Sequence, residues 1–228
     1  MLRHKVLLLS FAACLLVVGT ATQPAFADIM ATNSTTGLFD ASSGTRTVAF
    51  DGTEAGYGTG QIFDVNISIN FAKADGESFD PPYPGGTPFY NEIHFHLTSP
   101  GGTVVHLIEP SSWGAGSGQF DGTITFDDEA GSVVNFGAAP VAGSFRPTGP
   151  GALSDYDSLT ADSALGTWTL FIQDTVGLDA LRFRSFTLNI ATAASAVVVP
   201  EPATLVSCSI GVIGLLGYAW RRRKRAVA

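Results

Sequence analysis

The sequence predicts an all-β fold, a jelly-roll-like β-sandwich of about eight strands, within a chain of 228 residues. Apolar and polar residues alternate along short segments, and clusters of Gly, Pro, Asp and Ser separate these segments. No window holds a sustained helical period, so strands rather than helices are expected. Residues 28–199 lie between two hydrophobic ends and have a length typical of one domain with its own core.

The clearest predicted strand contains Val65, Ile67, Ile69 and Phe71, which alternate with polar residues. This period of two places one face on a core and the other in water. The other predicted strands cover residues 47–50, 92–99, 103–108, 123–126, 132–136, 166–174 and 183–190.

Turn and packing patterns support these strands. Residues 99–102, Ser-Pro-Gly-Gly, predict a tight turn, because Pro fixes φ and Gly permits a positive φ. Two later strands each place an apolar set on one face: Trp168, Leu170 and Ile172, then Phe186, Leu188 and Ile190. Trp168 is therefore predicted to lie in the core rather than to serve as a ligand platform.

Four segments are predicted to lie outside the strands. Residues 75–90 and 138–155 are rich in Gly and Pro and are expected to form surface loops. Residues 28–42 are expected to be loose, and the small residues of 191–198 are expected to form a linker to the C-terminal tail.

The N-terminus predicts export. A basic start and an apolar run at residues 6–18 precede Ala25 and Ala27, which offer a small-x-small cleavage site. Residues 1–27 are therefore predicted to be a secretory signal peptide, with Asp28 the first mature residue. The cysteines, Cys14 and Cys208, both fall outside residues 28–199, so no disulfide is expected in the domain.

The C-terminus predicts a membrane span. Residues 203–220 are uncharged and mostly apolar, and five consecutive cations follow at 221–225. Eighteen helical residues reach about 27 Å, close to the thickness of a bilayer core. Because cations beside a span stay in the cytoplasm, the domain is expected outside it. A plain C-terminal membrane anchor is one interpretation of this pattern.

A second interpretation rests on the residues that precede the span. Val199 is followed by Pro200, Glu201 and Pro202, and the whole of 199–225 resembles the PEP-CTERM sorting signal of Gram-negative bacteria. The resemblance implies that an exosortase, a membrane-embedded cysteine-dependent enzyme, recognises the Pro-Glu-Pro residues and removes the tail. It also implies an inner-membrane precursor and a mature protein at the cell surface or in the extracellular polysaccharide matrix.

The domain carries a second resemblance. Residues 93–103, 126–130 and 166–174 resemble segments of the P domain, or Homo B domain, of proprotein convertases, and the resemblance spans about residues 63–190. It implies a jelly-roll sandwich that supports a neighbouring subtilisin-like protease. Residues 91–92 depart from the family pattern, and 75–90 forms an insertion. No Gly-x-Ser-x-Gly elbow occurs, so the chain is not expected to be an enzyme.

Charge excludes one class of partner and suggests a cofactor. Residues 28–199 contain 19 Asp and Glu but only 5 Lys and Arg, a net charge of −14, which argues against nucleic acid. Carboxylates in loops and at strand ends are typical calcium ligands. The alternative interpretations are that these carboxylates form a solvated acidic face or accept hydrogen bonds in turns. The candidate calcium ligands are Asp121, Asp127, Asp128, Glu129 and Asp174.

Three histidines form a candidate transition-metal site. His94 and His96 are two residues apart on a predicted strand and share a face, and His106 lies on the predicted hairpin partner. Three imidazoles are suitable ligands for zinc or copper. The alternative is that these side chains face water or an aromatic neighbour.

Together these observations predict an exported, non-catalytic surface or matrix protein with a binding or structural sandwich. One alternative is a P domain that assists a secreted subtilisin-like protease. Another is a carbohydrate-binding module, in which Tyr57, Trp113 and Phe120 contact sugar rings. The competing interpretation of these aromatic residues is local packing.

Overall fold

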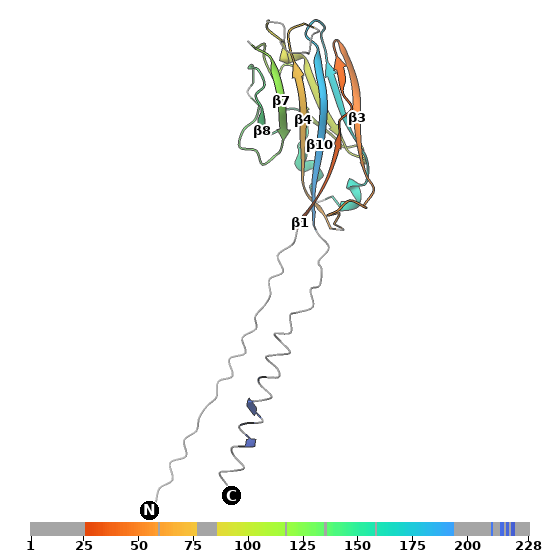
Figure 1. The fold of residues 1–228 in the computed structure, drawn as a ribbon, viewed down its shortest axis with the longest axis vertical. Coiled ribbons are helices and arrows are strands. Elements are labelled where there is room, and N and C mark those ends of the chain that lie inside the picture. Colours follow the sequence, from red (N-terminus) through yellow and green to blue (C-terminus); the bar gives the residue numbers. More distant parts are fainter. Residues whose placement is uncertain are drawn as a thin grey trace, which may run out of the picture.

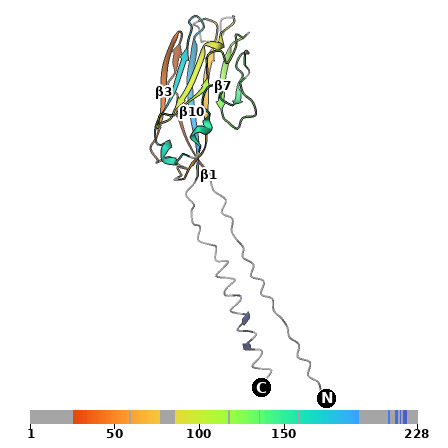
Figure 2. The ribbon, with the colours of Figure 1, turned by 180° about the vertical axis from the view of Figure 1, so that it is seen from behind.

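The computed structural model describes residues 26–58, 60–76, 86–116, 118–134, 136–157 and 159–193, with six further residues between 211 and 221. Within these ranges, ten strands form two sheets and three short 3-10 helices connect them. Figures 1 and 2 show the strands from opposite sides. The predicted all-β sandwich is confirmed, with ten strands rather than eight.

The larger sheet has six strands, in the order β1-β10-β4-β7-β8, and β2 also pairs with β10. Its central strands β4 and β10 run side by side through most of their length (Figure 1). The pairs are antiparallel except β7–β8, which is parallel. The strands are β1 (Phe26–Asn33), β2 (Gly37–Phe39), β4 (Ile62–Lys73), β7 (Phe120–Phe126), β8 (Gly143–Phe145) and β10 (Leu181–Ala193).

The smaller sheet has four antiparallel strands in the order β3-β9-β5-β6. These are β3 (Ser42–Phe50), β5 (Ile93–Thr98), β6 (Val104–Ile108) and β9 (Gly166–Asp174). The 3-10 helices are η1 (Tyr90–Glu92), η2 (Leu153–Tyr156) and η3 (Ala161–Ala164).

The core lies between the sheets and follows the predicted alternation. The four apolar residues of the clearest predicted strand lie in β4 and are buried, while the polar residues between them are partly exposed. Trp168 is fully buried in β9, and its indole Nε1 donates a hydrogen bond to the Ala164 carbonyl at 2.9 Å. Its predicted place in the core is confirmed.

The predicted turn between β5 and β6 is also confirmed. The Gly102 amide donates to the Ser99 carbonyl at 2.9 Å, and Gly102 has φ +87°. A positive φ at this position favours glycine because a Cβ would be strained.

Four expectations for the connections are wrong in whole or in part. Residues 191–193, predicted to begin the linker 191–198, are the end of β10. Residues 28–42 are not loose, because β1 pairs with β10 along its whole length and β2 pairs with the same strand. The described residues of the predicted strand 132–136, which are 132–134 and 136, belong to no strand, and Val133 forms an isolated bridge with Arg146. Residues 138–155, predicted to be a loop, include β8 and part of η2.

The first and last strands meet at one end of the sandwich, here called the terminal end. Phe26 is the register partner of Ala193, and the beginning of β4 pairs with Thr192 beside it (Figure 1). Gly58 packs so closely here that a Cβ would lie 2.0 Å from the Ala193 carbonyl oxygen. At the other end, called the distal end, Leu181 pairs with Lys73.

Candidate functional site

A cluster of three imidazoles, here called the histidine cluster, lies on the outer face of the smaller sheet. His94 and His96 point outward from β5 because Phe95 between them is buried in the core. His106, on β6, is the register partner of His96. One ring nitrogen from each of the three lies within 4.8 Å of the other two, so the predicted common face is confirmed.

Close contacts surround the histidine cluster. His94 Nε2 and His106 Nδ1 are 3.2 Å apart, and His106 Nδ1 is 2.9 Å from Glu109 Oε1. The Phe171 ring, on β9, stacks on His96 with centroids 4.5 Å apart and planes at 10°. His96 Nδ1 is buried and has no hydrogen-bond partner in the described part of the chain.

The surroundings keep two members of the histidine cluster, His94 and His96, neutral near pH 7. Burial, followed by the neighbouring imidazoles, lowers the pKa of His96 to about 4. Burial and His106 also lower the pKa of His94. Neutral imidazole is the form that binds metal ions, so metal would not have to displace protons from these two rings at neutral pH.

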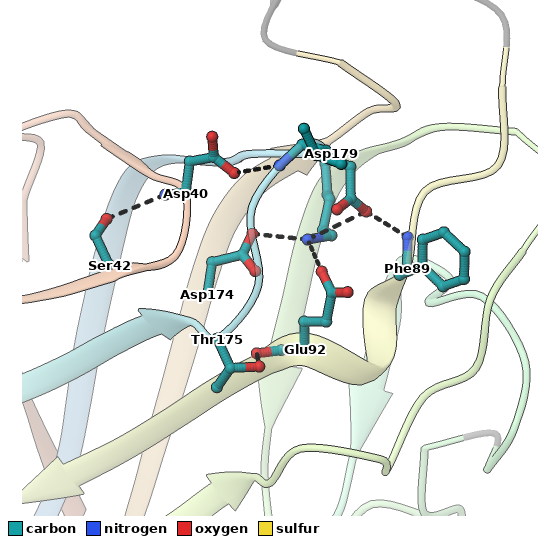
Figure 3. A network of polar contacts seen from close by, with 9 residues as sticks. Asp40, Ser42, Phe89, Glu92, Asp174, Thr175 and Asp179 are labelled. Carbon is teal, nitrogen blue, oxygen red and sulfur yellow. Dashed lines mark hydrogen bonds and ion pairs between the residues drawn. The ribbon is translucent and has the colours of Figure 1, made fainter.

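A second cluster lies inside the distal end and is here called the ion network: Lys73, Glu92, Asp174 and Asp179. Lys73 is fully buried, and its Nζ lies 2.7 Å from Asp174 Oδ2, 3.1 Å from Glu92 Oε2 and 3.4 Å from Asp179 Oδ2. In Figure 3 the carboxylates of Glu92, Asp174 and Asp179 point toward one nitrogen atom. They come from β9, η1 and the β9–β10 loop, so one ammonium group joins both sheets.

The ion network also fixes the backbone around it. The Phe89 amide donates to Asp179 Oδ2 at 2.5 Å, and the Thr175 amide and hydroxyl donate to the Glu92 carbonyl (Figure 3). Burial raises the pKa of Glu92 to about 7, and the hydrogen bond from Lys73 opposes this rise. Burial likewise raises the pKa of Asp174. One ammonium group cannot neutralise three carboxylates, so a carboxyl proton here lowers their repulsion.

Sequence reasoning missed the ion network, although one signal was present. Continuing the alternation beyond Phe71 places Lys73 on the apolar, inward face of β4. A charged residue at such a position requires buried partners of opposite charge. The partners themselves lie up to 106 residues away in the sequence, and no local pattern identifies them.

The five candidate calcium ligands lie in three separate places. Asp174 belongs to the ion network, while Asp121 is on the outer face of the larger sheet, where Arg184 binds both of its oxygens. The remaining three, at 127–129, follow β7. Their geometry does not support one five-ligand calcium site, and bound calcium stays a prediction.

The residues after β7 form a hydrogen-bonded turn, as the alternative interpretation held. Asp127 Oδ1 accepts from the Glu129 amide at 2.7 Å, and Asp128 Oδ2 accepts from the Ser154 amide at 2.5 Å. Burial first, then Asp64 and Asp128, raise the pKa of Asp157 to about 6. The turn therefore lies beside further carboxyl groups that sequence reasoning did not connect with it.

The aromatic residues considered for sugar binding do not form an exposed row. Trp113 and Phe120 are 2% and 6% exposed and belong to the core, so that prediction is wrong for both. Tyr57 is partly buried, and its hydroxyl donates to Asp162 at 2.7 Å. Core packing explains these residues, as the alternative interpretation held.

Comparison with known families bears on the C-terminus. Residues 198–224 match the PEP-CTERM protein-sorting motif, which confirms the predicted resemblance and indicates export, surface sorting and processing by an exosortase. No curated protein matches the chain.

Several predicted features of the termini fall outside the structural description. The sorting residues Pro200, Glu201 and Pro202 lie outside the described residues, as do Ala25 and most of the signal peptide; Ala27 belongs to β1. Most of the predicted span 203–220 is also outside them. Among the residues that are described, no helix has the length and apolar character needed to cross a membrane.

Proposed function

We propose that this chain is an exported, non-catalytic β-sandwich that an exosortase-type enzyme processes and that then serves as a component of the bacterial surface or extracellular polysaccharide matrix. The observation that carries the proposal is the sorting motif at residues 198–224. It follows shortly after Ala193, the last residue of β10. The folded domain therefore joins the sorting tail through its final strand.

The strand order supports a domain that is held at one end. The beginning of β1 and the end of β10 pair at the terminal end, and β10 runs the length of the larger sheet. A tail leaving Ala193 would hold the sandwich at that end and present the distal end outward. The ion network favours a structural role there, because its buried ammonium group on the larger sheet pairs with the Asp174 carboxylate on the smaller sheet.

The sorting step is tested by mass spectrometry of the protein recovered from the surface of a bacterium that has an exosortase. Wild type is expected to end near Pro200 and to lack residues 203–228. Glu201→Gln is expected to retain the tail and remain with the membrane. Glu129→Gln, the same substitution at an exposed position of the domain, is the matched control and is expected to be processed normally.

An intact tail on surface-recovered wild type would overturn the sorting proposal, as would normal processing of Glu201→Gln. A deletion strain tests the matrix role separately: adhesion is expected to change while extracellular peptidase activity does not. The resemblance of residues 63–190 to the P domain, its jelly-roll connectivity and its protease partner stay predictions. A subtilisin-like protease that co-purifies with the chain would favour them over the matrix role.

A further inference from the structure

The histidine cluster contains every histidine of the exported part of the chain. The sequence has four histidines, and the fourth, His4, lies in the predicted signal peptide. Both cysteines also lie outside residues 28–199. Three of the strongest metal-binding side chains in the domain therefore meet at one point, from the two strands of the β5–β6 hairpin.

The strand register holds the three rings together before any ligand arrives. His96 and His106 are directly opposite one another across β5 and β6, and His94 is the next outward residue on β5. Ligands around a tetrahedral zinc ion at about 2.0–2.1 Å from the metal lie about 3.3 Å apart. The 3.2 Å between His94 Nε2 and His106 Nδ1 is close to this spacing.

Neighbouring groups limit the movement of the imidazole rings and leave one ring nitrogen without a hydrogen-bond partner. Phe171 stacks on His96, and Gly149 packs so closely that a Cβ would lie 2.4 Å from the His106 Cβ. His96 Nδ1 has no partner in the described residues, although it is buried. Glu109 Oε1 lies 2.9 Å from the same nitrogen, His106 Nδ1, so a metal ion bound at that nitrogen would take the place of this contact.

We propose that His94, His96 and His106 bind one divalent transition-metal ion of the kind that prefers imidazole, zinc or copper. Three imidazole nitrogen ligands suit these ions, whereas calcium and magnesium prefer oxygen. A fourth coordination position stays open to water or an external donor. The site goes beyond the sorting and surface role, and it does not depend on either.

Isothermal titration calorimetry with Zn²⁺ and Cu²⁺ on the untagged full chain, with its cysteines alkylated, tests the proposal. One ion is expected to bind per chain. His94→Ala, His96→Ala and His106→Ala are each expected to weaken binding by about 100-fold or more. His4→Ala is the matched control, because it removes a histidine outside the cluster, and its affinity is expected to equal that of wild type.

A second readout identifies the ligands directly. Nitrogen-15 spectra of the histidine rings are expected to shift for three residues on adding Zn²⁺ and to leave His4 unchanged. Near-ultraviolet circular dichroism, which reports on the buried Trp113 and Trp168, verifies that each variant is folded. The absence of one-to-one binding in folded wild type would overturn the proposal, as would wild-type affinity in folded His96→Ala.

Discussion

The ion network and the histidine cluster are both groups of ionisable side chains next to β5, and they differ in the charges that they bring together. In the ion network, opposite charges surround a fully buried ammonium group and connect the two sheets. In the histidine cluster, three like groups share a half-buried face, and a ring nitrogen of His96 has no partner among the described residues. Asp174 Oδ1 in the ion network is also without a hydrogen-bond partner among the described residues. The difference therefore lies in the charges: the ion network pairs opposite charges across the two sheets, and the histidine cluster gathers three imidazoles that suit a metal ion.

The two regions also respond to pH in opposite directions. Burial raises the pKa of Glu92 and lowers that of His96, because in each case it penalises the charged form. Protonation therefore relieves repulsion within the ion network but introduces an uncompensated charge into the histidine cluster. Three predictions test this contrast.

The largest effect is expected from Lys73→Met, which keeps the buried aliphatic chain but removes its charge. Three buried carboxyl groups then lose their cation, and the free energy of unfolding is expected to fall by about 3–5 kcal/mol at pH 7. Urea unfolding followed by near-ultraviolet circular dichroism measures this. Arg184→Met breaks the exposed pair with Asp121 and, as the matched control, is expected to cost at most about 1 kcal/mol. Equal losses in the two variants would contradict the structural role of the ion network.

A smaller, pH-dependent effect is expected from Glu92→Gln. The pKa of Glu92 rises from 4.5 to about 7 on folding, so the folded state holds the proton more tightly. Its contribution to stability is fully present below about pH 4.5 and is lost as the pH rises to about 7. The free energy of unfolding of wild type is expected to fall relative to that of the variant by about 1–3 kcal/mol over this range.

Urea titrations of both proteins from pH 4 to pH 8, with a chelator present, measure this difference. Comparing the two proteins at each pH removes the contribution of the other carboxyl groups. A difference that stays constant across the range would show that Glu92 has no raised pKa in the folded state.

The smallest effect is expected from His96→Ala in metal-free buffer. The variant loses the stacking contact with Phe171, which is worth about 0.5–1.5 kcal/mol. Urea unfolding is expected to show a loss within this range, well below that of Lys73→Met. A loss above about 3 kcal/mol would remove the contrast, because the histidine cluster would then be as important to the fold as the ion network.

Much of the sandwich was predictable because strand alternation is a local property. The predicted strand 166–174 coincides with β9, and the residues around Ile67 and Phe186 have the predicted faces. β1 was missed because its apolar and polar residues do not alternate, with Ile29, Met30 and Ala31 consecutive, and its place in the sheet comes from pairing with β10. The segment around Val133 has strand-like residues, but in its described part the pairing is a single bridge to Arg146.

By itself the sequence determined the alternating strands, the sorting motif and the common face of the three histidines, since each depends on spacing within one segment or one hairpin. Only the tertiary structure decided that Lys73 meets Asp174, that Asp121 pairs with Arg184 and that Trp113 is buried. The two ion pairs join strands that are distant in the chain. A strand's period fixes which face a side chain occupies, whereas the order and packing of whole sheets fix which distant residue it meets there.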